Sequence, residues 1–398
     1  MTLRQKIEKE IREHGPMPFS RYMELCLYHP ELGYYSRDAE QFGKAGDFYT
    51  SSDVHAVFGR LMARQFEEMW RVLGSPEPIE ILELGPGRGL FAQDVLDWSE
   101  KKFPEFFGAL HYSLVESSPV LRDRLQATLN RHFRSGKASL RQRLKPPSWA
   151  ESYGAAEALP NSIAMERALA PEVPLIVFTN EFFDALPVEV LSAQGELRIS
   201  ENNGRLLEIW HAASAEELNF LDRYGVHPEP GERIEAPLIA QRWMSQIAAA
   251  VERGFIIAID YGYTRQEQLA GRHRGTVAAY RQHSASANPY EAPGEQDITA
   301  HVNFTALAAA AEDHGMRTHP LLSQSQFLMG IGEHNQFADA FEECRLPQER
   351  AKVALQLKHL VTPAGMGESF HVLVASKGIA AEKVTALSGL TFGKTEPR

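Results

Sequence analysis

Three glycines in alternate positions follow an apolar run in the segment ILELGPGRGL, residues 81–90, and a glutamate stands near the end of that run. Gly85, Gly87 and Gly89 are expected at a turn between a strand and a helix. Glycines let the backbone turn sharply and let a ligand approach without meeting a Cβ atom. The spacing is G-x-G-x-G, whereas dinucleotide-binding proteins have G-x-G-x-x-G. The segment predicts a nucleotide-type site, and a simple strand-to-helix turn is the alternative.

The acid at the base of this turn indicates the charge of the ligand. Glu83 would repel a pyrophosphate, and Pro86 removes one amide donor from the loop. A ligand that carries an ammonium, a sulfonium and a ribose suits the loop better, and S-adenosylmethionine is such a ligand. We expect Glu83 near its positive methionyl end, directly or through water. We expect Glu116, at the end of the next strand, to accept hydrogen bonds from the ribose hydroxyls.

A second polar group, in the segment TNEFFDALP, follows another apolar strand. Asn180, Glu181 and Asp184 are therefore expected near the methyl group of the bound cofactor. A carboxylate that holds the acceptor group by paired hydrogen bonds would orient its nucleophilic atom for attack, and Glu181 and Asp184 are the candidates. The alternative is a capped, solvated turn. Phe182 and Phe183 are expected either to form a wall of the site or to fill the core.

Two further segments contain candidate residues. Gly46, Asp47 and Thr50 lie in an aromatic, glycine-rich loop that could close over the cofactor, or could form an ordered surface turn. His301, in the segment DITAHVNF, could accept a proton, since a free histidine titrates near neutrality. A structural histidine is the alternative. The same segment could also be a helix start, with Asp297 or Thr299 as its cap.

Strands and helices alternate from residue 79 onward, which predicts how these residues are positioned. Apolar strands are expected at 79–85, 110–116, 173–180 and 254–262, with helices after the first two. Such alternation favours an α/β fold with a mostly parallel sheet covered by helices on both faces. Ligands bind such sheets at the carboxyl ends of the strands. The stretch from 188 to 214 differs, because it predicts antiparallel strands with a turn at residues 202–204.

Composition and charge exclude several classes of protein. The 398 residues carry a formal net charge of -11, which gives no support for a nucleic-acid partner. The two cysteines, Cys26 and Cys344, show no metal-ligand spacing, so we expect neither a disulfide framework nor a metal site. We expect no membrane insertion, because no segment reaches roughly 18 uninterrupted apolar residues. The reduced cysteines and an acidic amino-terminal segment, unlike a mitochondrial presequence, predict a cytoplasmic location.

Six segments, taken together, resemble the MidA-like proteins. KAGDFYTSSD, ELGPGRG, NEFFDALPVE, IIAIDYG, YRQH and PGEQDITAHVNF occur in the order found in that family, and the similarity extends from about Leu3 to Lys377. The family consists of class I S-adenosylmethionine-dependent methyltransferases. It includes a mitochondrial protein arginine methyltransferase that acts on a subunit of respiratory complex I. The resemblance implies a seven-stranded, Rossmann-like sheet with an added helical and β-hairpin part, S-adenosylmethionine as cofactor and a protein substrate.

The expected organisation has five parts. An amino-terminal helical and loop segment (1–75) packs on a catalytic domain, which is formed by residues 76–190 and 254–380. A β-hairpin and helical insertion (191–253) interrupts this domain, and residues 381–398 are expected to be a flexible tail. The leading hypothesis is methyl transfer to a protein arginine by direct displacement. A small-molecule methyltransferase and an inert assembly protein with the same fold are the alternatives, and the sequence does not indicate the oligomeric state.

Overall fold

The computed structural model describes residues 1–37, 56–141, 172–281, 284–286 and 288–392. Its main sheet is mixed but mostly parallel, in the order β15-β17-β10-β5-β2-β3-β4. Four long strands form its centre: β2 (Ile79–Leu84), β3 (Leu110–Val115), β5 (Leu175–Asn180) and β10 (Gly254–Tyr263). These are the four strands that the sequence predicts, and all are parallel to their neighbours among them. The expected α/β fold is confirmed.

Shorter strands and one antiparallel strand complete the main sheet. β4 (Ala138–Leu140) is parallel to β3, whereas β17 (Phe370–Lys377) is antiparallel to β10. Two short strands pair with β17, namely β15 (Arg317–Thr318) and β16 (Leu322–Ser323). One more, β14 (Val302–Asn303), pairs with the end of β10. The main order has the seven strands that the resemblance implies, and β14 and β16 bring the whole sheet to nine strands.

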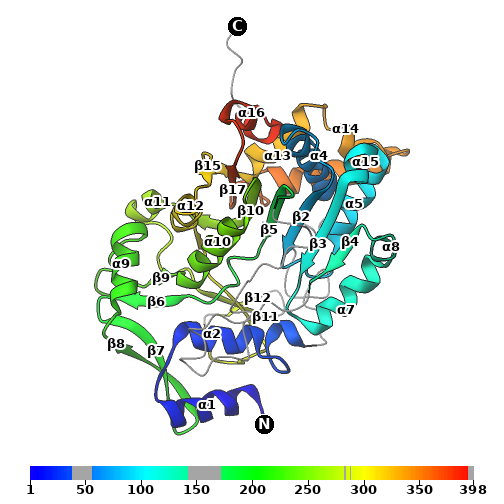
Figure 1. Cartoon of the computed structure of the whole chain (residues 1–398). Coiled ribbons are helices and arrows are strands. Elements are labelled where there is room, and N and C mark those ends of the chain that lie inside the picture. The colour runs from blue at the N-terminus through cyan, green and yellow to red at the C-terminus, as the bar shows by residue number, and fades with distance from the viewer. Residues whose placement is uncertain (38–55, 142–171, 282–283, 287, 393–398) are drawn as a thin grey trace.

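Helices cover both faces of this sheet, because its strands are apolar on both sides (Figure 1). Phe178 and Ile257 pack on one face, whereas Val177 and Ile256 pack on the other. The first face is covered by α4 (Ala56–Val72), α5 (Leu90–Lys102), α6 (Pro104–Ala109), α7 (Pro119–Thr128), α13 (Gln324–Glu333), α14 (Ala338–Phe341) and α15 (Pro347–Val361). The second face is covered by α10 (Leu238–Ala250) and α12 (Phe304–Glu312). Short α8 (Asn130–Arg134) follows α7.

A second sheet lies beside the main one and contains the predicted hairpin (Figure 1). Its antiparallel strands are β6 (Glu189–Ser192), β7 (Gly195–Asn202), β8 (Arg205–His211) and β9 (Ile234–Ala236), and β1 (Met17–Pro18) joins it at β7. Asn203 and Gly204, both with positive φ, form the turn between β7 and β8. Helix α9 (Ala215–Tyr224) packs beside this sheet, and α11 (Arg265–Leu269) follows β10.

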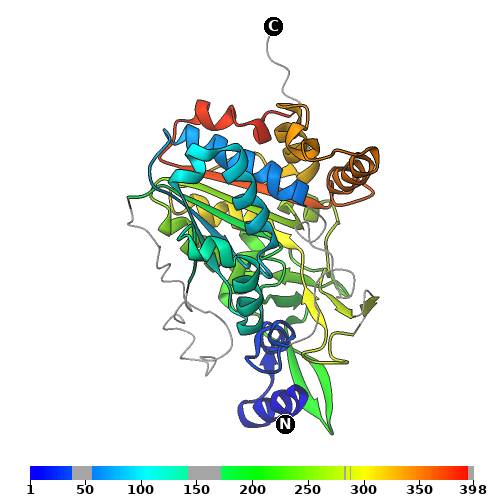
Figure 2. The same ribbon diagram turned by 90° about the vertical axis from the view of Figure 1, so that its right-hand side faces the viewer.

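The amino-terminal helices pack against the second sheet, not against the main one. α1 (Leu3–His14) and α2 (Phe19–Tyr28) share a core with β7 and with β13 (Asp297–Thr299), which belongs to a small third sheet with β11 (Ala278–Arg281) and β12 (Ser284–Ser286). Figure 2 shows α1 and the long hairpin side by side. Helix α4 packs on the main sheet instead. The first 75 residues are therefore divided between two cores.

Two details of the predicted elements are wrong. Residues 381–392 do not form a flexible tail, since α16 (Ala381–Thr385) and a 3-10 helix (Ser388–Leu390) insert Val384, Leu387 and Leu390 into the main core. The cap of the helix after residue 297 is neither Asp297 nor Thr299, because both belong to β13. Asn303 caps α12 instead, where its Oδ1 accepts a hydrogen bond 3.0 Å long from the amide of Ala306.

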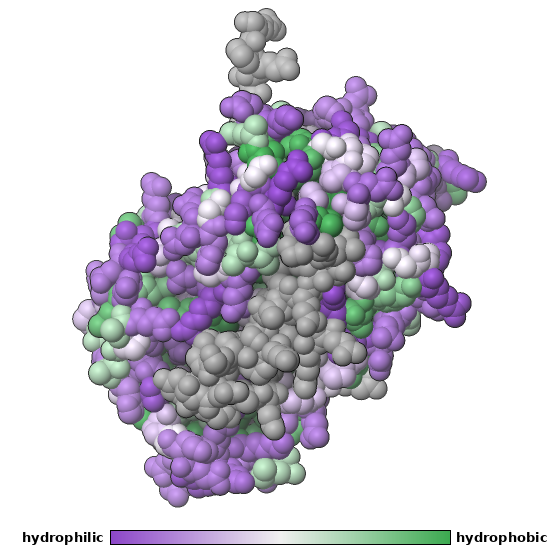
Figure 3. Space-filling view, in the orientation of Figure 1, coloured by the Kyte–Doolittle hydropathy of each residue, from purple (hydrophilic) through white to green (hydrophobic). Residues whose placement is uncertain are grey.

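The visible surface of the described residues is mostly hydrophilic, with hydrophobic side chains in scattered patches (Figure 3). Within the described part of the chain, no helix has both the length and the apolar character that crossing a bilayer requires.

Candidate active site

The glycine turn begins at the carboxyl end of β2 and leads directly into α5. Gly85, Gly87 and Gly89 have φ of 68°, 53° and 76°, a region that L side chains rarely adopt. The amide of Gly89 donates to the carbonyl of buried Pro86 at 2.9 Å, which closes the turn. A Cβ atom at Gly87 would meet no heavy atom of the described residues within 4 Å. The backbone at Gly87 is therefore open to a ligand.

Glu83 lies on β2 just before this turn, and only 4% of its surface is exposed. The hydroxyl of Tyr112, on neighbouring β3, donates to Glu83 Oε2 at 2.9 Å. Burial, with a smaller contribution from the charge of Glu116, raises the pKa of Glu83 to about 8. The hydrogen bond from Tyr112 acts in the opposite direction and lowers this pKa. A buried acid with such a pKa becomes ionised when a cation binds beside it.

Glu116 follows β3 and lies at the same edge of the sheet. Its Oε1 accepts a hydrogen bond 2.8 Å long from the amide of Ser118, and its carboxylate also accepts from the amide of Gly87. Burial raises the pKa of Glu116 to about 7, and the hydrogen bonds from these amides partly offset this rise. Ser118 then caps α7 through a hydrogen bond from the amide of Leu121. The structure thus brings Glu83, Glu116 and the glycine turn together.

The polar turn after β5 lies at the carboxyl edge of the next strand. Glu181 has a φ of 52°, and its Oε1 accepts a hydrogen bond 3.0 Å long from Asn180 Nδ2. Asp184 is 5% exposed, and its Oδ2 accepts from the hydroxyl of Tyr261 at 2.5 Å. Burial raises the pKa of Asp184 to about 6, so its carboxyl is largely ionised at neutral pH. Asn180 Oδ1 and Asp184 Oδ1 are both buried without a hydrogen-bond partner among the described residues.

Asp260 holds the shape of this turn from the end of β10. Its Oδ2 accepts hydrogen bonds from the successive amides of Phe182, Phe183 and Asp184, at 3.2, 3.0 and 3.3 Å. Its Oδ1 accepts from the amide of Tyr261 at 2.9 Å. Burial and the charge of Asp184 raise the pKa of Asp260 well above its usual range. The sequence predicted a strand at 254–262 but did not indicate this role for Asp260.

The two phenylalanines of the turn have different surroundings. Phe183 is 2% exposed and belongs to the core beneath α10 and α12. Phe182 is only partly buried, and its ring meets Trp243 edge-on at 5.3 Å. A Cβ atom at Gly85 would lie 3.1 Å from Phe182 Cδ2. Phe182 therefore lies against the glycine turn, so the turn after β5 is adjacent to the cofactor loop.

His301 lies near this edge but is poorly suited to accept a proton. Its Nδ1 is 3.0 Å from Nδ1 of His273, and its ring meets Tyr261 edge-on. Burial, together with the charge of His273, lowers the pKa of His301 to about 4. A group with this pKa is a weak base at neutral pH. The geometry favours the structural interpretation of this residue.

Two residues at this site were not identified from the sequence. Tyr28, at the end of α2, donates its hydroxyl to the carbonyl of Ala185 at 2.9 Å. Tyr35, in a 3-10 turn (Tyr34–Ser36), donates to Oδ1 of Asp297 at 3.1 Å. The only sequence signal was the aromatic character of the segment around Tyr35. Gly46, Asp47 and Thr50 lie outside the described residues.

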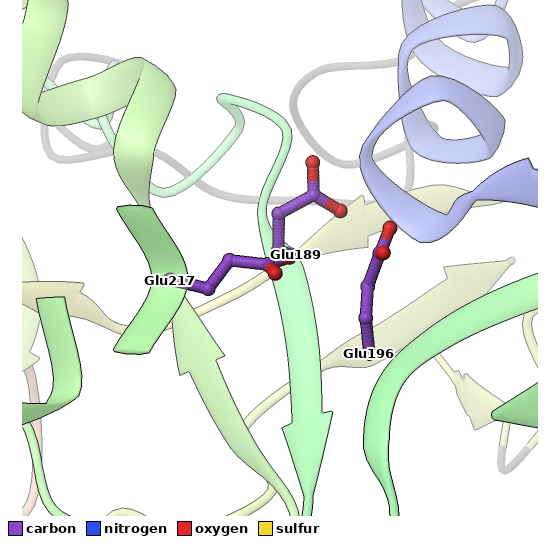
Figure 4. Close-up of side chains that lie close together, drawn as sticks. All are labelled: Glu189, Glu196 and Glu217. Carbon is purple, nitrogen blue, oxygen red and sulfur yellow. The ribbon is translucent and has the colours of Figure 1, made fainter. Parts of the chain in front are cut away.

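Three glutamates, from β6, β7 and α9, form a separate acidic group (Figure 4). Oxygens of Glu189, Glu196 and Glu217 lie within 4.8 Å of one another. Each carboxylate accepts a hydrogen bond from a protein donor, namely Ser20, Arg198 and the amide of Ser214. Burial raises the pKa of Glu189 to about 7. These contacts are sufficient to explain the group as part of the protein core.

The fold and the site define a class. A parallel sheet whose first strand leads into an open glycine turn, with two buried acids ready to ionise beside it, fits a cationic nucleoside such as S-adenosylmethionine. These are the features of an S-adenosylmethionine-binding protein with the class I methyltransferase fold.

Comparison with known proteins agrees with this class. Residues 61–322 match the family described as "Putative S-adenosyl-L-methionine-dependent methyltransferase", and the chain belongs to this family. It is 30% identical to the mitochondrial protein arginine methyltransferase NDUFAF7 homolog of Drosophila melanogaster, over 96% of this chain and 86% of that one. It is 25% identical to human NDUFAF7, a mitochondrial protein arginine methyltransferase, over 91% of this chain and 80% of that one.

A solved structure supports the cofactor. A protein of Burkholderia thailandensis, crystallised with S-adenosyl-homocysteine, is 26% identical and has a TM-score of 0.76, with 97% of this chain and 94% of that one covered. The resemblance to the MidA-like methyltransferases is thereby confirmed. The protein is an S-adenosylmethionine-dependent methyltransferase.

The expected cytoplasmic location is contradicted by these relatives, which are named as mitochondrial proteins. The prediction depended on two unpaired cysteines and on the charge of the first residues. Unpaired cysteines indicate only that thiols stay reduced, and this does not distinguish one reducing compartment from another.

Proposed function

We propose that the protein transfers a methyl group from S-adenosylmethionine to a guanidino nitrogen of arginine in a protein substrate. The observation that carries the proposal is the pair of buried acceptor atoms after β5, Asn180 Oδ1 and Asp184 Oδ1, which lack partners among the described residues. Buried acceptors without donors are costly, so they favour a ligand rich in N–H groups. The names of the relatives add support for arginine. The family resemblance favours a respiratory complex I subunit as the substrate.

The residues after β5 would bind and orient the acceptor. A guanidinium is cationic and delocalised, and it attacks in line only when one nitrogen is held in position. Asp184, ionised at neutral pH, would hold two of its N–H groups and stabilise its positive charge. Glu181, beside it on the turn, is a second candidate for this contact.

The remaining groups would serve the cofactor and the proton. When bound, S-adenosylmethionine supplies an electrophilic methyl group, and its sulfur keeps the electron pair of the broken S–C bond. Glu83 would stabilise the positive end of the cofactor, and Glu116 would accept from the ribose hydroxyls. Once the N–C bond has formed, the nitrogen loses one proton, which passes to Asp184 or to water. Phe182 would limit the access of water to the reacting atoms.

The test is the fate of a labelled methyl group in cell extract. We expect label in protein, released on acid hydrolysis as methylarginine. Asp184→Asn should lower kcat by about 100-fold or more, equivalent to roughly 2.7 kcal/mol, because charge stabilisation is lost. The affinity for S-adenosylmethionine should stay within about threefold. Asp222→Asn, which changes an exposed aspartate paired with His227, is the matched control and should leave kcat unaltered.

Other outcomes would overturn the proposal. Label found only in small molecules would indicate a small-molecule methyltransferase. Cofactor binding without any transfer would indicate an inert binding protein. Gly87→Val should abolish cofactor binding, since its Cβ would enter the space open to the ligand.

A further inference from the structure

Two buried carboxylates from different sheets surround one pair of tyrosines. Asp184 follows β5 of the main sheet, Asp297 begins β13 of the third sheet, and each is 5% exposed. The hydroxyl of Tyr28 donates a hydrogen bond to the carbonyl of Ala185, the residue next to Asp184. The hydroxyl of Tyr35 donates a hydrogen bond to the carboxylate of Asp297. The two tyrosine rings lie 5.5 Å apart. These contacts bring residues from three distant parts of the chain together.

The electrostatics agree with this geometry. Burial raises the pKa of Tyr28, and the charges of Asp297 and Asp184 raise it further. The same two carboxylates also raise the pKa of Tyr35, after burial. Both phenols therefore remain protonated at neutral pH and can donate hydrogen bonds. The charges of both carboxylates therefore act on the same two phenols.

This group of side chains is also linked to the cofactor site. The hydroxyl of Ser118 donates to the carbonyl of Tyr35 at 2.6 Å, and the amide of Ser118 binds Glu116. The segment that carries Tyr35 thus contacts the loop assigned to the cofactor ribose. A ligand held between Asp184 and Asp297 would lie beside the cofactor.

The chemistry of these side chains fits one class of cation. A guanidinium is planar and weakly hydrated, stacks on aromatic rings and pairs with carboxylates through two parallel hydrogen bonds. An ammonium is compact and strongly hydrated, so its burial costs more. The hydroxyl of Tyr261 donates a hydrogen bond to Asp184 Oδ2, whereas Asp184 Oδ1 has no hydrogen-bond partner among the described residues. Asp184 therefore has an acceptor atom, Oδ1, for a ligand.

We propose that Asp184, Asp297 and the rings of Tyr28 and Tyr35 form a guanidinium-binding pocket. This assignment rests on the proposed function, and it adds Asp297, Tyr28 and Tyr35 as residues that determine specificity for the acceptor. In this arrangement Tyr35 is a positioning residue, since its hydroxyl orients the carboxylate of Asp297.

The experiment uses the full chain saturated with S-adenosyl-homocysteine, titrated calorimetrically with ethylguanidinium and, separately, with n-butylammonium. We expect ethylguanidinium to bind about 10-fold more tightly or better. Asp297→Asn should weaken ethylguanidinium binding by about 10-fold or more, and Tyr35→Phe by roughly threefold. Both variants should leave the affinity for S-adenosyl-homocysteine within about twofold. Glu295→Gln is the matched control, because it removes an exposed acid paired with Arg281 and should change neither affinity.

Each outcome decides between the inference and the proposed function. Equal binding of the two cations, or unchanged ethylguanidinium binding in both variants, would overturn the pocket. If Asp297→Asn also weakens the binding of S-adenosyl-homocysteine, this substitution has disturbed the fold. The effect of Tyr35→Phe on ethylguanidinium binding then tests the pocket by itself. Methylarginine formation with an unaltered KM in Asp297→Asn would reject the pocket and keep the function. Selective guanidinium binding with methyl transfer only to other acceptors would reject the function and keep the pocket.

Discussion

At the scale of single residues, the cofactor site depends on acids that resist ionisation until a cation arrives. Burial raises the pKa of Glu83 to about 8 and that of Glu116 to about 7, far above the usual range of a glutamate. Both carboxyls are therefore partly protonated near neutral pH in the free protein. A bound sulfonium favours the ionised form, so cofactor binding and loss of protons are linked.

We expect the preference for S-adenosylmethionine over S-adenosyl-homocysteine to increase with pH. The two ligands carry the same amino group, so its titration cancels in the ratio of their affinities. Between pH 6 and pH 8 this ratio should rise by roughly three- to tenfold, because ionised Glu83 attracts the charged sulfur, which only S-adenosylmethionine carries. Calorimetry at several pH values measures both affinities. In Glu83→Gln the rise should fall to the smaller part that Glu116 contributes, and a constant ratio in the unaltered protein would contradict the assignment.

At the scale of elements, the turn after β5 is held by the strand beside it. β10 is parallel to β5, so the end of β10 places Asp260 directly beneath the turn. One carboxylate oxygen accepts three successive amides there, which fixes the positions of Glu181 and Asp184. The positive φ of Glu181 is maintained by these contacts.

Asp260→Ala should therefore destabilise the protein and reduce turnover together. Four amides, those of Phe182, Phe183, Asp184 and Tyr261, would lose their acceptor, at a cost of about 3 kcal/mol or more in the free energy of unfolding. Denaturant unfolding measures this change, and methyl transfer measures the loss of activity. Asp260→Asn retains one carbonyl oxygen and should have an intermediate effect. A loss below about 1 kcal/mol in Asp260→Ala would show that the turn holds its shape without this carboxylate.

At the scale of the whole molecule, the first and last described segments complete different cores. The amino-terminal helices α1 and α2 close the core of the second and third sheets. The carboxyl-terminal segment packs on α4, where the amides of Ser388 and Gly389 donate to the side chains of Glu68 and Gln65. Helix α4 thus connects residues 381–392 to the main sheet.

Leu387→Ala tests this role of the carboxyl-terminal segment. Leu387 is 2% exposed within the main core, so its truncation should lower the free energy of unfolding by about 2–4 kcal/mol. Lys383→Ala, on the exposed side of α16, is the control and should cost less than about 0.5 kcal/mol. Thermal and denaturant unfolding of both variants measure the difference. Equal stability of the two variants would mean that residues 381–392 contribute little to the core.

The sequence by itself determined the local features. The alternation of strands and helices, the glycine turn with Glu83, and the polar turn at Asn180, Glu181 and Asp184 follow from periodicity and turn chemistry within short windows. They were sufficient to predict the class of fold and the charge of the cofactor, because a parallel sheet places its strand ends at one edge.

Only the tertiary structure decided which side chains meet and how they titrate. Asp260 beneath the turn, Tyr28, Tyr35 and Asp297 around Asp184, and the packed carboxyl-terminal segment all depend on contacts between residues far apart in the chain. The low pKa of His301 follows from burial and from His273, which no local pattern reveals. Burial and charge proximity are properties of the folded chain, and they determine which predicted residues can bind, orient or ionise.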